Sequence, residues 1–185
     1  SPLDTILHAL FSRYGFSAQQ IPELKKLMDA STGKFILSDT HRVLKNREWF
    51  LVDKIENNDH GLIILDDFNT ENIFTEGKIL IDLNFLGNVD PDPSIACIDR
   101  TKLKLPLILR PIKAGDYFYP LGMKKKKKLF RFMTDLKLSR IEKEKQWVLE
   151  SDKKIVWVVG RRIDDRFKLS SSAESFIKMS FLPNT

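Results

Sequence analysis

The spacing of apolar residues predicts two helices at the start of the chain. Over residues 2–14 an apolar side chain recurs every three or four positions, which is the pattern of an amphipathic helix, and Gly15 ends it. A second stripe predicts a helix over 18–30, with a start near Ile21 because Pro22 suits a first helical turn. We expect both stripes to be core. The apolar residues of the first are Leu3, Ile6, Leu7, Leu10, Phe11 and Tyr14.

Beyond Gly33 apolar and polar residues alternate, which is the period of β-strands. Strands are predicted at 34–37, 41–45, 49–53, 61–65, 78–83, 94–98, 104–110, 147–150, 154–159 and 175–181. Helical spacing returns at 126–137 and 140–145. The polar, acidic segment 66–77 interrupts the strands, and we predict a domain boundary there.

The predicted fold class is α+β, in two domains. Residues 1–72 are expected to form a small helical unit with a short antiparallel sheet. Residues 73–185 are expected to form a basic α+β domain with a mixed or antiparallel sheet.

Charge is distributed unevenly between the two halves of the chain. The net charge of +6 is the sum of −6 over residues 1–100, which hold 10 Lys/Arg and 16 Asp/Glu, and +12 over residues 101–185, which hold 21 and 9. A strongly basic domain attracts phosphate polymers and binds them without reading their sequence. The second half is therefore expected to bind nucleic acid.

Other functional classes have little support in the sequence. The lone Cys97 suits a reducing cytoplasm and lies in an apolar run, as a buried structural thiol does. No apolar stretch is long enough to predict a membrane span. The histidines lack metal-ligand spacing, and no nucleophile–base set is recognisable. We therefore predict no catalytic residue, no metal and no cofactor in this chain.

The residues with the strongest binding chemistry lie between 109 and 128, in the segment LRPIKAGDYFYPLGMKKKKK. A turn punctuated by Gly, Pro and Asp carries two tyrosines and leads into five consecutive lysines. Point charges of this kind contact phosphate rather than bases. Tyr117 and Tyr119 either stack on exposed bases or pack against the turn prolines.

A second basic cluster, GRRIDDRFK, covers residues 160–168. In a regular strand Arg162, Arg166 and Lys168 share one face. Asp164 and Asp165 among them are expected to form salt bridges rather than to hold a metal. The predicted RNA-binding residues of both clusters are Arg110, Lys113, Lys124, Lys125, Lys126, Lys127, Lys128, Arg131, Lys137, Arg140, Arg161, Arg162, Arg166 and Lys168.

Three motifs in this order resemble the C-terminal domain of the bacterial tRNA(Ile)-lysidine synthase family. They read ILRPIKAGDYFYPLGM at 108–123, KKKKLFRFMTDLKLSR at 125–140 and IVWVVGRRIDDRFK at 155–168. The resemblance is specific over about 94–168 and weaker before it. Members of the family often carry basic residues where this chain has Tyr117 and Tyr119.

The resemblance implies a function. The family's complete enzyme adenylates the wobble cytidine in the CAU anticodon of tRNA(Ile) and joins lysine to it, using ATP and magnesium. This chain has no glycine-rich SGGxDS-type phosphate loop, so we expect the central and C-terminal domains without the N-terminal ATP-pyrophosphatase domain. The implied partners are tRNA, gripped near its acceptor stem, and that N-terminal domain, and the implied location is the cytoplasm.

A protein–protein docking module with incidental RNA binding is the alternative, because a basic face also suits an acidic protein.

Overall fold

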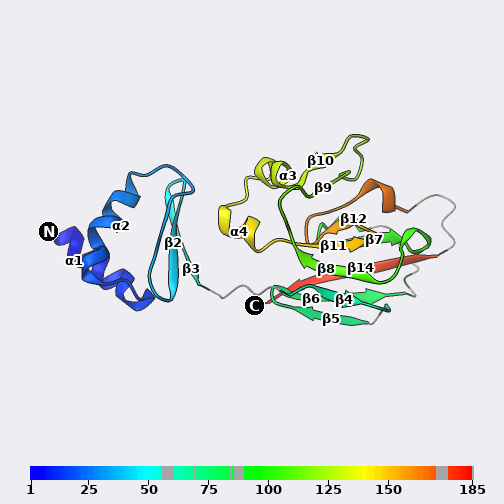
Figure 1. Ribbon diagram of the computed structural model, residues 1–185, viewed down its shortest axis with the longest axis horizontal. Helices are drawn as coiled ribbons and strands as arrows, with labels where there is room; N and C mark the ends of the chain where they lie inside the picture. The colour runs from blue at the N-terminus through cyan, green and yellow to red at the C-terminus, as the bar shows by residue number, and fades with distance from the viewer. Residues whose placement is uncertain (56–60, 69, 84, 86–89, 170–174, 185) are drawn as a thin grey trace. The chain divides into compact units, whose positions relative to one another are not determined.

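The computed structural model describes residues 1–185 except 56–60, 69, 84, 86–89, 170–174 and 185. The chain forms two compact units (Figure 1). The first contains residues 1–59 together with 139–141, and the second contains 60–138 and 142–185. The predicted boundary at 72/73 is corrected by this division, because residues 61–72 belong to the second unit.

The first unit consists of helices packed on a three-stranded antiparallel sheet. Gly15 ends the first helical segment in the left-handed region, with φ of 78°, and Gln20 Oε1 accepts a hydrogen bond from the Ser17 backbone N–H at 3.1 Å. Both predicted helices and the three predicted strands are confirmed. Their bounds are α1 Pro2–Phe11, η1 Ser12–Tyr14, η2 Ala18–Gln20, α2 Ile21–Met28, β1 Phe35–Leu37, β2 His41–Asn46 and β3 Trp49–Lys54.

Only part of the predicted apolar stripe on α1 is core. Leu7 and Phe11 are buried with Leu24 of α2, whereas Ile6 is 55% exposed. Leu3 and Leu10 are exposed as well. The stripe is wider than the surface that covers it, so the expectation that all of it is core is wrong.

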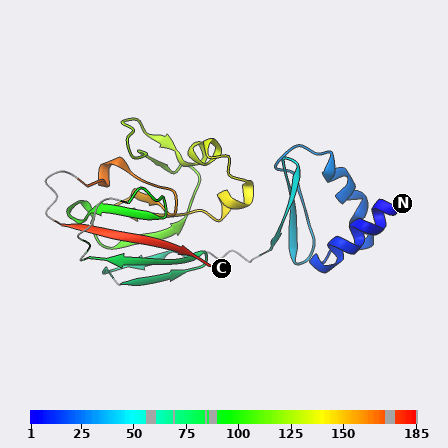
Figure 2. The same cartoon turned by 180° about the vertical axis from the view of Figure 1, so that it is seen from behind.

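The second unit has two antiparallel sheets packed face to face (Figure 1). The five-stranded sheet has the order β13-β12-β11-β8-β4 and the four-stranded sheet the order β5-β6-β14-β7. Figure 2 shows β14, in red, running along the four-stranded sheet. The strands are β4 Ile63–Leu65, β5 Glu71–Phe74, β6 Gly77–Asp82, β7 Ile95–Asp99, β8 Leu107–Pro111, β11 Trp147–Ser151, β12 Lys154–Val158, β13 Arg162–Ile163 and β14 Phe176–Pro183.

Alternating side chains of both sheets fill the core between them. Ile79 and Ile177 from one sheet meet Leu109 and Trp157 from the other, all with at most 1% exposure. Residues 71–74, predicted to lie in a connection, pair with β6 as β5. In β5 the buried positions are Asn72 and Phe74. Because Asn72 is polar, the sequence did not show the alternation of apolar and polar residues that identifies a strand.

A third layer covers the other face of the five-stranded sheet. It consists of the helix α3 Leu129–Asp135 and of the hairpin formed by β9 Tyr117–Phe118 and β10 Lys127–Lys128. The short helix α4, Arg140–Glu144, follows α3 in the chain. Phe118, Leu129 and Met133 are fully buried against Val148 and Val158 of the sheet. This packing positions the lysine-rich segment on the surface of the unit (Figure 1).

Candidate nucleic-acid interface

The segment from Ile112 to Lys128, called here the basic turn, rests on a buried ion cluster. Arg110 at the end of β8 donates from Nε and Nη2 to Glu150 Oε2 at 2.8 and 2.7 Å. Its Nη1 and Nη2 donate to the two oxygens of Asp116 at 2.9 and 3.0 Å. Asp116 Oδ2 also accepts the backbone N–H of Lys113, which closes the turn.

Arg110 is therefore corrected from a tRNA contact to a structural residue. The side chain is buried, and the carbonyl of Pro111 takes the remaining Nη1 donor at 3.0 Å. Burial lowers the pKa of Arg110, but the hydrogen bonds to Asp116 and Glu150 outweigh it and leave that pKa raised. A guanidinium with five N–H donors, all engaged inside the protein, has none left for a ligand.

The two aspartates of the RRIDDRF motif hold the far side of the basic turn. Asp164, fully buried, accepts the backbone N–H of Tyr119 at 2.9 Å, and Asp165 accepts that of Gly122 at 2.9 Å. Backbone bonds add to this, with Asp165 N donating to Tyr119 O and Leu121 N to Ile163 O. Two motifs far apart in sequence thus form one structural unit.

Salt bridging by these aspartates, the ordinary role expected for them, is confirmed. Asp164 accepts from Nε and Nη2 of Arg166 at 2.9 and 2.8 Å, and Asp165 accepts from Lys168 Nζ at 3.0 Å. The hydrogen bonds that Arg166 donates to Asp164 raise the pKa of Arg166. The backbone N–H of Gly122, followed by Lys168, lowers the pKa of Asp165.

The condition that the strand is regular through this motif is not met. β13 ends at Ile163, and Asp165–Phe167 form a 3₁₀ turn, η4, in which Asp164 Oδ1 accepts the backbone N–H of Arg166 at 2.9 Å. Arg162, Arg166 and Lys168 therefore do not share a strand face. The alternation rule fails here because a side-chain cap, rather than a strand ladder, satisfies the backbone.

Each tyrosine of the basic turn carries a cation on its ring. Lys126 Nζ lies 5.1 Å from the centroid of Tyr117, and the Arg166 guanidinium lies 4.5 Å from that of Tyr119. The two rings meet edge to face at 6.4 Å. Tyr117 is 47% exposed, so its side chain is partly accessible to solvent.

Six of the predicted lysines extend into solvent. None of them forms an ion pair with a carboxylate among the described residues, so their charge is available to an outside anion. They are Lys113, Lys124, Lys125, Lys126, Lys128 and Lys137.

The other predicted cations have partners within the chain. Lys127 and Arg131 both pair with Asp135, at 2.8 and 3.3 Å. Arg161 Nε donates to Gln146 at 3.4 Å, and exposed Arg162 donates to the Leu121 carbonyl at 3.2 Å. These residues contribute to the positive surface, but part of their hydrogen-bonding capacity is used inside the protein, unlike that of the six lysine side chains within the described part of the chain.

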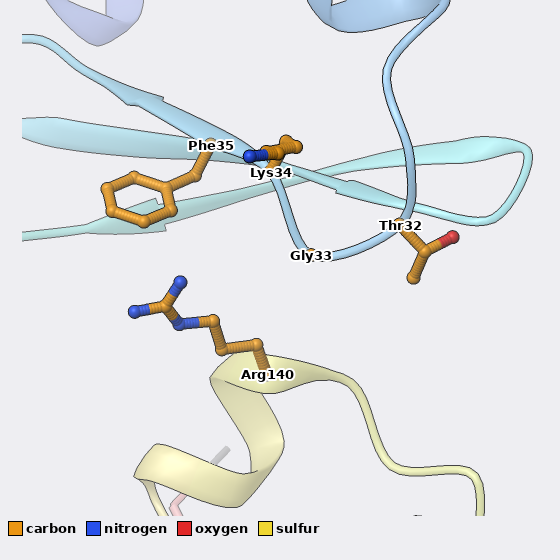
Figure 3. A pocket seen from close by; sticks show the side chains of 5 residues that line it. All are labelled: Thr32, Gly33, Lys34, Phe35 and Arg140. Carbon is orange, nitrogen blue, oxygen red and sulfur yellow. The ribbon is translucent and has the colours of Figure 1, made fainter.

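Arg140 belongs by its contacts to the first unit. Figure 3 shows it in a pocket lined by Thr32, Gly33, Lys34 and Phe35. Its guanidinium lies 4.6 Å from the centroid of the Phe35 ring. The predicted role of Arg140 in RNA binding stays a prediction.

The described residues contain no group of three or more His, Cys, Asp or Glu side chains able to hold a metal ion. Within the same residues no helix is long and apolar enough to cross a membrane. What the geometry does provide is a rigid, doubly held turn that presents lysines and an exposed aromatic ring. The sequence did not reveal Asp116 and Glu150 as the buried partners of Arg110. Arg110 and Glu150 are 40 residues apart and come into contact only because β8 pairs with β11.

Comparisons with known proteins agree with this architecture. The family model described as "TilS substrate binding domain" matches residues 1–55, and the one described as "TilS substrate C-terminal domain" matches residues 107–179. A solved structure titled "Crystal structure of TILS C-terminal domain" superposes with a TM-score of 0.53 at 18% identity, covering 66% of this chain and 92% of that one. This likeness supports the fold.

Curated relatives share the sequence over nearly the whole chain. A tRNA(Ile)-lysidine synthase of Parabacteroides distasonis is 38% identical over 97% of this chain, and one of Bacteroides thetaiotaomicron is 32% identical over 88%. The chain spans 41% and 36% of those proteins, respectively. From the motifs, the fold and these matches, the chain belongs to the tRNA(Ile)-lysidine synthase family and carries its substrate-binding and C-terminal domains.

Proposed function

We propose that this chain is the tRNA-gripping part of a tRNA(Ile)-lysidine synthase. The observation that carries the proposal is the basic turn, in which exposed lysines without described carboxylate partners are mounted on a frame held by buried aspartates. Lysines of this kind neutralise backbone phosphates, and A-form RNA is gripped mainly through phosphates, 2′-hydroxyls and shape. The curated relatives carry tRNA(Ile) in their names.

The whole protein is proposed to act as an ATP-dependent ligase in the cytoplasm. It would join lysine to the wobble cytidine of the CAU anticodon, with ATP and magnesium bound outside this chain, and the second unit would grip the acceptor-stem side of the tRNA. The 185-residue chain by itself is then inactive. Incubation with tRNA, lysine and ATP should give no AMP and no lysidine, and turnover of ATP to AMP would contradict this assignment.

The first unit is proposed to contact the N-terminal catalytic domain of the same protein. Residues 1–59 hold 8 Lys/Arg and 8 Asp/Glu, so this segment has no excess positive charge to attract a phosphate polymer, whereas Leu3, Ile6 and Leu10 of α1 expose an apolar stripe. An exposed stripe of this kind marks a protein contact. In the full-length protein the amides of α1 should exchange with deuterium more slowly than in this chain, and equal exchange would contradict the contact.

Binding of the 185-residue chain to tRNA at several salt concentrations tests the main proposal. If roughly five phosphates are neutralised, the slope of log K against log salt is about −3.5 to −4.5. Competition with generic double-stranded RNA distinguishes tRNA recognition from general polyanion binding. A slope near zero would contradict the nucleic-acid assignment.

A further inference from the structure

A second group of cations surrounds a small pocket, most of whose lining residues lie outside the sequence motifs. The pocket has a volume of about 150 Å³ and lies in the second unit. Lys102 and Lys104 reach it from the segment before β8, Lys154 from the start of β12, and Arg166 from η4. Asp152 is the one carboxylate in its lining.

The walls of this pocket are fixed to one another by hydrogen bonds. Ser151 Oγ accepts the Lys104 backbone N–H at 2.8 Å and donates to the Lys104 carbonyl at 3.0 Å. Lys102 Nζ donates to the Lys168 carbonyl at 2.8 Å, which ties the segment before β8 to the end of η4. The turn between β11 and β12 has left-handed φ values of 48° and 59° at Asp152 and Lys153, as a tight hairpin requires.

Donors remain unused in the pocket after these contacts. Lys104 Nζ gives one hydrogen bond to Asp152 at 2.9 Å and keeps two N–H groups. Lys154 has no ion pair with a described carboxylate, and Arg166 uses Nε and Nη2 on Asp164, so that Nη1 bonds to no described residue. The neighbouring carboxylates Asp99 and Asp164 are outside the lining.

We propose that this pocket binds a phosphate group of the RNA backbone, separately from the basic turn. Lys102 pairs with Asp99 at 3.4 Å, Lys104 with Asp152 at 2.9 Å and Arg166 with Asp164 at 2.8 Å. The N–H groups that these pairs leave unused, together with the ammonium of Lys154, favour an anion with several oxygens. The volume, roughly five times the ~30 Å³ of a water molecule, has room for a phosphate. The source is RNA rather than free phosphate because the Arg166 that lines the pocket also stacks on Tyr119 of the basic turn. The assignment of the bound phosphate to an RNA backbone rests on the proposed tRNA function. The proposal that the pocket binds a phosphate does not depend on that function.

Two variants with equal charge change test the RNA assignment. Lys104→Gln with Lys154→Gln removes two pocket cations. Lys25→Gln with Lys78→Gln removes two exposed lysines that pair with Asp4 and Glu71 elsewhere. The pocket variant should make the slope of log K against log salt for tRNA less negative by about 0.7–0.9, the contribution of one phosphate, with an unchanged melting temperature. The control should keep the slope of the unchanged chain, and equal slopes for both variants would overturn the proposal.

A titration with inorganic phosphate, followed by backbone amide resonances in NMR, tests the pocket without RNA. Saturable shifts at residues 102–104, 151–154 and 166, lost in the Lys104/Lys154 variant, are expected. If these shifts are absent, phosphate binding by the pocket is refuted, even if the chain binds tRNA. If they are present and the chain does not bind tRNA, phosphate binding by the pocket stands and the proposed function is refuted. Shifts accompanied by an unchanged tRNA slope would overturn the RNA source.

Discussion

Two sets of positively charged side chains in the second unit have different roles. We call the structural arginines, Arg110 and Arg166, the frame of the basic turn, and the exposed lysines, Lys124, Lys125 and Lys126, its rim. In the frame, Arg110 and Arg166 make paired hydrogen bonds to buried carboxylates. In the rim, Lys124, Lys125 and Lys126 are exposed and face no described carboxylate. Net charge counts both sets equally, but the rim lysines make no ion pair with a described carboxylate, whereas the frame arginines use most of their donors inside the protein.

The difference follows from the side chains themselves. Arginine offers a planar fork that matches a carboxylate, so it suits buried pairs, whereas lysine is a strongly hydrated point charge that stays in water. Frame variants should therefore change stability, and rim variants should change binding.

The largest expected effect follows from Arg110→Met. Removing one member of a buried ion cluster leaves Asp116 and Glu150 without compensation, which costs about 3–5 kcal/mol of unfolding free energy. Arg131→Met is the matched control, because Arg131 is exposed and its pair with Asp135 contributes about 0–1 kcal/mol. Chemical denaturation of both variants measures the difference, and equal losses would show that Arg110 is not part of the frame.

Asp164→Asn should come next. The amide oxygen keeps one acceptor, but the charge opposite Arg166 is lost and its NH₂ group faces the Tyr119 N–H or the guanidinium. We expect a loss of about 1–3 kcal/mol. The NMR signals of Tyr119 and Leu121 should shift as the turn loosens. A variant as stable as the original chain would mean that the turn is held by its backbone bonds alone.

Gly122→Ala tests the shape of the turn with a smaller effect. Gly122 has φ of 87°, and a Cβ there would meet no atom within 4 Å, so the cost is backbone strain of about 1–2 kcal/mol. Gly61→Ala is the control, since Gly61 also has open space but no left-handed φ. If both variants unfold at the same denaturant concentration, strain at Gly122 is not significant.

Acidification gives the smallest effect on the frame. The pKa of Asp165 is lowered in the folded state, so its contribution is present above the unfolded value of about 3.9 and is lost as pH falls through the folded pKa. Between pH 6 and pH 3, Asp165→Asn should lose less unfolding free energy than the unchanged chain. An identical loss in both proteins would show that Asp165 is not stabilised by Gly122 and Lys168.

The helices and strands were largely predictable because the spacing of apolar residues that identifies each one is visible within its own segment. The apolar runs of β8 and β11 and the stripe of α2 are local signals. β5 was missed since Glu71–Phe74 is an edge strand with polar residues. The exposure of Ile6 depends on what lies beyond α1, which no local pattern contains.

The position of the candidate site was predictable, but which of its charged residues hold the turn and which are exposed was not. The lysine run and its turn residues are visible in the sequence. The pairing of Arg110 with Glu150 depends on strand register, and the role of Asp164 depends on a turn returning from residues 45 positions away. The pocket formed by Lys102, Lys104 and Lys154 was missed for the same reason, as three separate segments build it.

Lys124→Gln, Lys125→Gln and Lys126→Gln together test the central claim most directly. With three rim charges removed, the slope of log K against log salt for tRNA should become less negative by about 2–3, while the unfolding free energy stays unchanged. A variant of equal charge change, Lys25→Gln, Lys78→Gln and Lys143→Gln, should keep the original slope. An unchanged slope in the rim variant, or a loss of stability in place of binding, would contradict the account.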